Sequence, residues 1–101
     1  MTSDPTVDAF IAAVNAGDRT AFFGLLTPDA SMYDDGTDRD LRAWTAKEIF
    51  DDNGHMEVES SSADGKSLII RYRNDTWGEM RTYWRFDVES GRVKRFETGQ
   101  A

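Results

Sequence analysis

The hydrophobic pattern of the chain changes its period once, near residue 55, and this change constrains the fold more than any other feature. Before it, apolar side chains such as Val7, Phe10 and Val14 recur at helical spacing, which predicts one buried stripe of a helix. After it, apolar and charged residues alternate, which predicts strands with one buried face. Helices followed by consecutive strands indicate an α+β domain whose helices cover one face of an antiparallel sheet.

Cap and turn signals divide the helical half. Asp4-Pro5 is typical of an N-cap followed by proline in the first turn. Gly17-Asp18 ends the first helix and caps a second, and Thr27-Pro28 is expected to stop that second helix, because the residue before proline avoids helical backbone. The sequence then predicts a short strand over residues 30–34, a turn at Asp35-Gly36, and a third helix over residues 38–52 that ends at Asn53-Gly54.

The strands after residue 55 are predicted to form a meander with a fixed register. Their apolar faces coincide if Val58 lies opposite Ile70 and Leu68 lies opposite Trp84. A shift of one residue would turn the arginines of these strands, such as Arg81, into the core. The cost of burying an unpaired charge excludes that register.

The hairpin loops carry their own signals. Residues 63–65 and 89–91 are each predicted as three-residue loops with glycine in the left-handed conformation. The loop between them must hold an odd number of residues to keep the apolar faces together. Two registers stay open for the last strand: one places Phe96 inward beside the third strand, and a bulge would instead turn Val93 and Glu97 inward.

Length and charge narrow the class of protein. A chain of 101 residues suits one domain. The net charge of −7, from 12 basic and 19 acidic residues, repels phosphate backbones and anionic lipid, so we expect neither nucleic acid nor a membrane as partner. Without cysteine, disulfides and thiolate metal sites are excluded, and we expect no metal or other cofactor. The N-terminal residues lack the pattern of a signal peptide, so a cytoplasmic location is expected.

The element order and several local sequences resemble the nuclear transport factor 2-like superfamily, including its SnoaL-like branch. Residues 10–18 are similar to the first-helix ending of its ketosteroid isomerase-like and SnoaL-like members, and residues 25–36 resemble their helix, strand and acidic turn. Residues 41–44 and 83–93 match the third helix and the terminal hairpin. The resemblance implies one domain over residues 1–101, a cone-shaped barrel whose curved antiparallel sheet wraps around three N-terminal helices. The superfamily hosts isomerases, cyclases, hydrolases and binding domains.

The resemblance assigns roles to a few residues. The general base of ketosteroid isomerase-like members, a carboxylate at the end of the first strand, corresponds to Asp34. Their oxyanion donors, a phenol and a protonated aspartic acid, correspond to Phe10 and Thr82, so the base is kept and both donors are altered. The epoxide-hydrolase branch uses an Arg-x-Asp pair, whose spacing recurs in Arg73 and Asp75, but the alternation places both on the charged outer face.

The side chains between helices and sheet are predicted to wall a pocket. We hypothesise that it binds a small apolar, carbonyl-bearing organic ligand, with Asp34 as general base of an isomerase-, cyclase- or lyase-like enzyme. No lysine or arginine is expected on the inner face, so desolvation should raise the pKa of Asp34. The predicted ligand-binding residues are Phe10, Met32, Trp44, Tyr72, Thr82, Trp84 and Phe96. The alternative is a non-catalytic binding or dimerisation module.

Several residues keep two interpretations. Asp34 can instead belong to a solvated Asp-Asp-Gly turn. Glu48 is either a carboxylate on the pocket rim or the partner of an arginine, and Trp77, at a hairpin tip, covers either the pocket mouth or a partner. The outer sheet face, with Ile69 and Tyr83 among compensating charges, predicts a homodimer.

Overall fold

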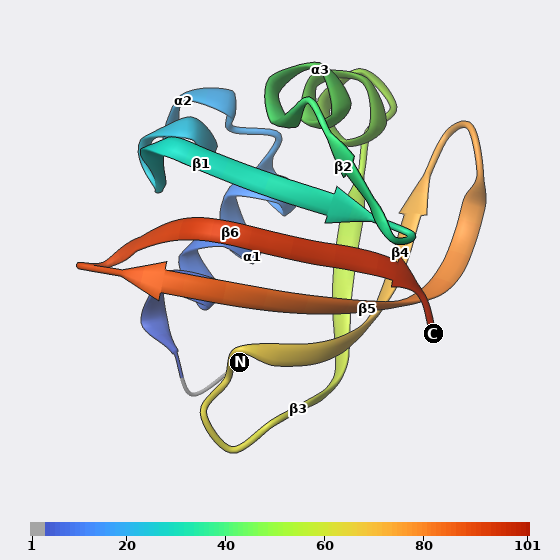
Figure 1. The fold of residues 1–101 in the computed structure, drawn as a ribbon. Coiled ribbons are helices and arrows are strands. Elements are labelled where there is room, and N and C mark those ends of the chain that lie inside the picture. Colours follow the sequence, from blue (N-terminus) through green and yellow to red (C-terminus); the bar gives the residue numbers. More distant parts are fainter. Residues whose placement is uncertain (1–3) are drawn as a thin grey trace.

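The computed structural model describes residues 4–101, and their six strands form one curved, unclosed sheet (Figure 1). The segment Met1–Ser3, part of the N-terminus expected to lack a signal peptide, lies outside the described residues. The strand order is β2-β1-β6-β5-β4-β3. The strands are β1 (Leu26–Asp34), β2 (Thr37–Arg39), β3 (His55–Ser61), β4 (Ser67–Asn74), β5 (Gly78–Glu89) and β6 (Arg92–Gln100). The α+β class is confirmed, but the sheet is mixed, since β1 and β6 run parallel.

The helices lie on one side of this sheet, with α1 behind the strands in the view of Figure 1. They are α1 (Pro5–Ala16), α2 (Arg19–Gly24) and α3 (Leu41–Thr45), which continues directly into the π-helix η1 (Ala46–Asp51). The predicted caps are present: the Asp4 carboxylate accepts the N–H groups of Thr6 and Val7 at 2.8 and 3.1 Å. Within residues 4–101, no helix is long and apolar enough to cross a membrane.

The prediction was wrong between the second and third helices. Helix α2 ends at Gly24, and β1 begins at Leu26 and runs through Pro28. Pairing with β6 decides this, because the Val93 N–H donates to the Leu25 carbonyl at 2.7 Å. The ladder is irregular between Leu26 and Ser31, where a proline without an N–H is tolerated.

Strand β2 was not predicted at all. The third helix was expected from residue 38, but it begins at Leu41, after Asp40, whose carboxylate accepts the Ala43 N–H at 3.1 Å. The three residues of β2 are all exposed. They therefore carry no hydrophobic alternation from which a strand could be recognised.

The meander register is confirmed. Val58 lies opposite Ile70 and Leu68 opposite Trp84, and the β4–β5 loop holds three residues, 75–77, between a paired Asn74 and Gly78. These pairs place the apolar residues of β4 and β5 on the helix-covered face.

The other two loops differ from the prediction because bulges shift their registers. In β3, the shift falls between Val58 and Ser60, and the following loop is longer than three residues. The β5–β6 loop is two residues long, with Ser90 and Gly91 at φ 51° and 77°, as in a tight hairpin turn.

A further bulge settles the last strand. The register of β5 against β6 shifts between Asp87 and Val88. As a result, Val93 and Phe96 are both fully buried, which neither of the two open registers anticipated. Glu97 lies opposite Arg85 on the outer face, and Thr98 lies inside.

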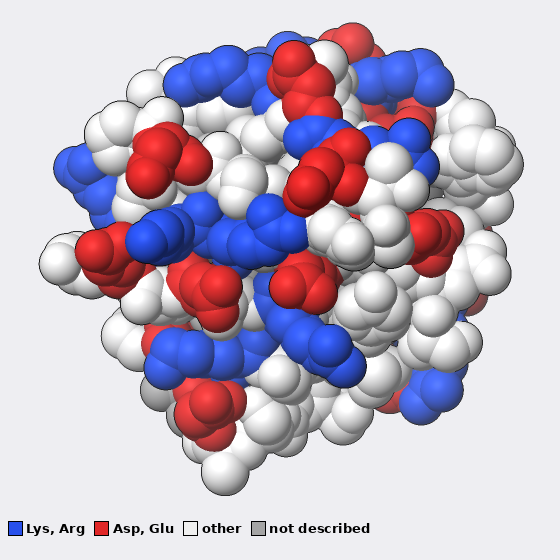
Figure 2. Space-filling view, viewed as in Figure 1, with Lys and Arg blue, Asp and Glu red and all other residues white. Residues whose placement is uncertain are grey.

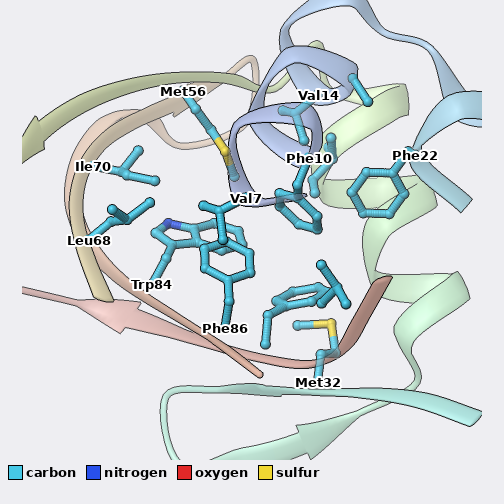
Figure 3. Close-up of a cluster of buried hydrophobic side chains, with 14 of the residues drawn as sticks. Val7, Phe10, Val14, Phe22, Met32, Met56, Leu68, Ile70, Trp84 and Phe86 are labelled. Carbon is cyan, nitrogen blue, oxygen red and sulfur yellow. The ribbon is translucent and has the colours of Figure 1, made fainter. Parts of the chain in front are cut away.

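The core is built around Trp84, whose indole lies beneath α1 (Figure 3). Its ring stacks on Phe96 with 5.6 Å between centroids, and Phe10 contacts Phe86 edge-on at 4.9 Å. The indole N–H donates to the Thr82 hydroxyl at 2.9 Å, so this buried donor is satisfied. Aromatic rings therefore fill the space between α1 and the centre of the sheet.

The π-helix is fixed to β4 by two hydrogen bonds to one carbonyl. The Tyr72 hydroxyl and the Asn74 amide donate to the backbone oxygen of Glu48 at 2.6 and 3.0 Å. Gly54 permits this approach: a Cβ at that position would lie 2.5 Å from the Tyr72 hydroxyl oxygen and 3.1 Å from the backbone of Ile49.

We therefore expect Gly54→Ala to lower the free energy of unfolding by about 1–3 kcal/mol, through overpacking and loss of the Tyr72 hydrogen bond. Urea denaturation measures this change. Gly24→Ala is the matched control, because a Cβ there meets no atom within 4 Å, and it should not destabilise the chain. In a Tyr72→Phe background, Gly54→Ala should cost less; an equal cost in both backgrounds would contradict the assigned clash.

Candidate functional site

A cavity of about 360 Å³ opens between the α3–η1 segment, the β4–β5 hairpin and the C-terminal ends of β1 and β6. Its volume lies at the lower end of the range of about 300–1,000 Å³ that is usual for small-molecule sites. The cavity is lined by Asp34, Asp35, Arg39, Trp44, Glu48, Tyr72, Asn74, Trp77, Met80, Thr82, Trp84, Thr98, Gly99 and Gln100.

Asp34 is the last residue of β1 and lies on the wall of this cavity. Its Oδ2 atom accepts the indole N–H of Trp44 at 3.2 Å. The Nε atom of Arg39 lies 3.9 Å from the same oxygen, and the Asp34 side chain is 23% exposed. Both of these contacts engage Oδ2.

Burial raises the pKa of the Asp34 carboxyl above its ordinary value, and the negative charge of Asp35 raises it further. The Trp44 hydrogen bond and the positive charge of Arg39 oppose this rise without cancelling it. The direction agrees with the expectation from sequence, but the expected surroundings were wrong, because a cation is present.

Arg39 is the basic residue of the site, and sequence reasoning missed it. It lies opposite Met32 in the β1–β2 pair, which brings its 45%-exposed side chain beside Asp34. A guanidinium has five N–H donors, so donors remain for a ligand oxygen. The Asp35-Gly36 dipeptide was a usable sequence signal for a hairpin, because an Asp-Gly turn closes a tight hairpin. In the structure both residues have positive φ, as such a turn requires. A hairpin at this turn would have placed residues 37–39 opposite the end of β1.

The hydroxyl groups of the cavity donate to the protein itself. Tyr72 donates to the Glu48 carbonyl, Thr82 donates to the Ile70 carbonyl at 2.8 Å, and Thr98 donates to the Tyr83 carbonyl at 2.9 Å. Burial also raises the pKa of Tyr72. These hydroxyl protons are therefore engaged, and the site lacks a hydroxyl oxyanion hole of the kind that the resemblance implies.

Glu48 and Trp77 form the rim of the cavity. The Trp77 indole N–H donates to Glu48 Oε2 at 3.1 Å, across the mouth between η1 and the β4–β5 loop. Glu48 has no arginine within ion-pair distance among the described residues; Lys47 lies 3.6 Å from its other oxygen. The sequence left two interpretations open for each of these residues. This geometry agrees with Glu48 as a carboxylate on the pocket rim and with Trp77 as a residue at the pocket mouth.

The structure brings together only part of the predicted ligand-binding set. Trp44, Tyr72, Thr82 and Trp84 line the cavity with Asp34. Phe10, Met32 and Phe96 do not line it; they are fully buried in the aromatic core. They lie too deep to reach the cavity, because α1 packs directly on this part of the sheet. The Phe10 ring of α1 fills the space there, with its centroid 5.3 Å from that of Phe96.

The remaining candidates lie elsewhere. Arg73 and Asp75 are exposed and do not line the cavity, nor does His55. Within residues 4–101, no three histidine, aspartate or glutamate side chains are grouped closely enough to hold a metal ion.

No family model and no curated protein matches this sequence. Solved structures do match it. An NTF2-like protein of unknown function from Cytophaga hutchinsonii superposes with a TM-score of 0.81 at 14% identity, over 100% of this chain and 91% of that one. The chain has the nuclear transport factor 2-like fold.

Two further proteins of this fold are named for activities. A candidate polyketide cyclase from Sinorhizobium meliloti matches with a TM-score of 0.75 and 22% identity, over 92% of each chain. A candidate ketosteroid isomerase from Kribbella flavida matches with a TM-score of 0.77 and 13% identity, over 98% of this chain and 77% of that one. At these identities the similarity concerns the nuclear transport factor 2-like fold itself.

We expect Trp44→Phe to raise the pKa of Asp34 further, because the variant loses the N–H that stabilises the ionised carboxylate. NMR titration of the Asp34 side-chain carboxyl carbon measures this pKa. Trp77→Phe is the control, since it removes an indole that donates to Glu48 instead. Equal pKa values of Asp34 in wild type and Trp44→Phe would show that the hydrogen bond is unimportant.

Proposed function

We propose that this protein binds a small apolar, carbonyl-bearing molecule and acts on it as an isomerase- or cyclase-like enzyme with Asp34 as general base. One observation carries the proposal. The carboxylate of Asp34, with a side chain that is 23% exposed and a raised pKa, stands on the wall of an aromatic-lined cavity, where Oδ2 accepts the Trp44 indole N–H. A base is most effective when its pKa lies near the working pH.

The proposed reaction begins with proton transfer. Oδ1 of Asp34 takes a proton from the carbon next to the ligand carbonyl, and the C–H electron pair moves toward the carbonyl oxygen to give an enolate. The Arg39 guanidinium donates to that oxygen as its charge develops. Return of the proton to a different carbon completes an isomerisation. Alternatively, the enolate carbon attacks a second carbonyl of the same molecule, a ring closes, and the proton passes to the new alkoxide.

The rival, a non-catalytic module, predicts a filled apolar interior. The cavity is instead open and combines a carboxylate, Asp34, with donors on Arg39 and Trp44. The names of the two proteins of this fold, a candidate cyclase and a candidate ketosteroid isomerase, favour the same reaction class.

Asp34→Asn tests the base. Because burial raises the folded-state pKa of Asp34 above its ordinary value of 3.8, the native state holds this proton more tightly than the unfolded state. The wild type should therefore lose stability as the pH rises from about 3.8 through the folded pKa. The variant should lack this loss and be the more stable chain at pH 7. Urea denaturation of both chains from pH 3.5 to pH 8 measures the difference.

The same variant should lose activity. The assay follows hydrogen–deuterium exchange next to the carbonyl of cyclic ketones such as 2-tetralone, by NMR in D₂O. Wild type should accelerate exchange over buffer, and Asp34→Asn should lower this rate by about 10²–10⁴-fold. Wild-type exchange no faster than buffer across the ketones, together with an ordinary pKa for Asp34, would refute the enzyme and leave the binding module.

We also propose that the protein forms a homodimer through the outer face of the sheet. Figure 2 shows basic and acidic side chains interleaved on this face. Opposite charges face one another across the strands, as Arg85 and Glu97 do. Ile69 and Tyr83 pair among them, both half-buried in the single chain. A two-fold axis brings such a self-complementary face against its copy.

Light scattering should accordingly find twice the chain mass, and added salt should weaken the dimer if ion pairs cross the interface. Ile69→Asp should shift the equilibrium toward the monomer. Thr20→Asp, which adds the same charge on exposed α2, should not. A monomer at high protein concentration and low salt would refute the dimer.

A further inference from the structure

The residues at the rim of the cavity indicate the charge of the ligand. We propose that Glu48 and Trp77 bind a cationic group, so that the ligand carries a protonated amine or a quaternary ammonium at the end that faces solvent. The inference deepens the proposed function by naming the substrate class, and it rests on that function only for the reacting end of the ligand.

Trp77 is held in place at the mouth although it is exposed. Among residues 4–101 it is the one large hydrophobic side chain that is exposed, at 62%. Its backbone N–H donates to the Asn74 side-chain oxygen at 2.8 Å. The neighbouring Thr76 hydroxyl donates to Asp52 at 2.6 Å, which ties the loop to the end of η1. These hydrogen bonds hold the loop so that the exposed Trp77 indole stays beside the cavity that it lines.

A hydrogen bond at the edge of the Trp77 indole orients the ring. Its N–H donates to Glu48 Oε2 at 3.1 Å. In the part of the chain that the structure describes, no aromatic ring and no arginine stacks on Trp77, whereas four arginines lie over other rings. The face of an indole is the best aromatic partner for a cation within about 6 Å. Trp77 thus places a cation-binding face next to a carboxylate.

The charges of the cavity favour the same class of ligand. Of the described residues that line it, Asp34, Asp35 and Glu48 are acidic, and Arg39 is the basic one. Arg39 lies beside Asp34, with its Nε 3.9 Å from the Asp34 carboxylate. At the rim, the Glu48 side chain is 17% exposed and that of its neighbour Lys47 is 70% exposed. The Lys47 Nζ lies 3.6 Å from Glu48 Oε1, and an ion pair with so exposed a partner contributes little.

Glu48 also acts on the reacting end. Its negative charge is one of the causes that raise the pKa of Asp34, so the two carboxylates lie within electrostatic reach of each other. A cation at the rim would offset this repulsion, which otherwise opposes ionisation of Asp34. The net charge of −7 also attracts cationic ligands to the protein.

Three matched probes test the proposal: 4-phenylbutylamine, 4-phenylbutan-1-ol and 4-phenylbutyrate, which share one apolar body and differ in charge. Isothermal titration calorimetry of the full chain measures each affinity, and the Trp77 indole N–H resonance reports the site. The amine should bind roughly tenfold more tightly than the alcohol, and the acid should bind most weakly.

Variants localise the effect. Glu48→Gln should lower amine affinity to about that of the alcohol while alcohol binding stays within twofold, and Trp77→Leu should lower amine affinity more than alcohol affinity. Glu97→Gln, which makes the same charge change on the outer face, should leave both affinities unchanged. The amide spectrum of each variant verifies its fold.

The outcomes separate this inference from the proposed function. Equal affinities for amine and alcohol, no binding of any probe, or an amine preference that survives Glu48→Gln would each overturn the cationic ligand. Asp34→Asn should keep a preference for the amine over the alcohol, because Glu48 and Trp77, the proposed cation-binding residues, are unchanged. A retained preference without ketone exchange in wild type would refute the base and leave the rim assignment standing.

Discussion

Two hydrogen bonds to the carbonyl of Glu48 determine the geometry on which the site depends. Tyr72 and Asn74 reach this oxygen from β4, and the wider turn of the π-helix ends with the Gly54 N–H donating to the Ile49 carbonyl at 2.6 Å. These hydrogen bonds hold η1 against β4, while the apolar side chains of Ile49 and Phe50 pack on the core. The space beside these polar contacts is the cavity. Its rim, formed by Glu48 itself, is set by the same anchor.

This anchoring has a chemical consequence. The hydroxyls that could stabilise an oxyanion, those of Tyr72, Thr82 and Thr98, each donate to a backbone carbonyl. Releasing one of them toward a ligand would break its hydrogen bond to the protein, which costs about 0.5–1.5 kcal/mol. Arg39 is the basic residue among the described residues that line the cavity, so its guanidinium is the charged donor there.

The sequence predicted those features that local physical chemistry decides. The cap at Asp4 and the alternation that pairs Val58 with Ile70 both depend on neighbours along the chain or on the cost of burying an arginine. Strand β2 was missed because its three residues are exposed and its pairing depends on the turn before it. A bulge was one of the two registers left open for the last strand, but its place between Asp87 and Val88 was not predicted, because the hydrophobic pattern there is ambiguous.

The same limit of sequence-based prediction applies to the candidate site. Alternation assigns a side chain to a face of the sheet but not to a depth, so Phe96 and Tyr72 looked equivalent from sequence. One is sealed beneath α1, and the other lines the cavity. Depth depends on where the helices lie, which is a property of the whole fold.

The environment of Asp34 reflects two opposing demands on one carboxylate. Burial makes it a stronger base, and Trp44 and Arg39 weaken it again. Burial without these two groups would raise the pKa of Asp34 further, and a close bidentate arginine would favour its ionised form more strongly. The observed arrangement is intermediate, because the Nε of Arg39 lies 3.9 Å away and its side chain is 45% exposed. At that distance the guanidinium lowers the pKa of Asp34 while keeping donors for a ligand oxygen. Both Trp44 and Arg39 approach Oδ2, so the groups that orient the carboxylate lie on one side of it and the oxygen proposed to take the proton lies on the other.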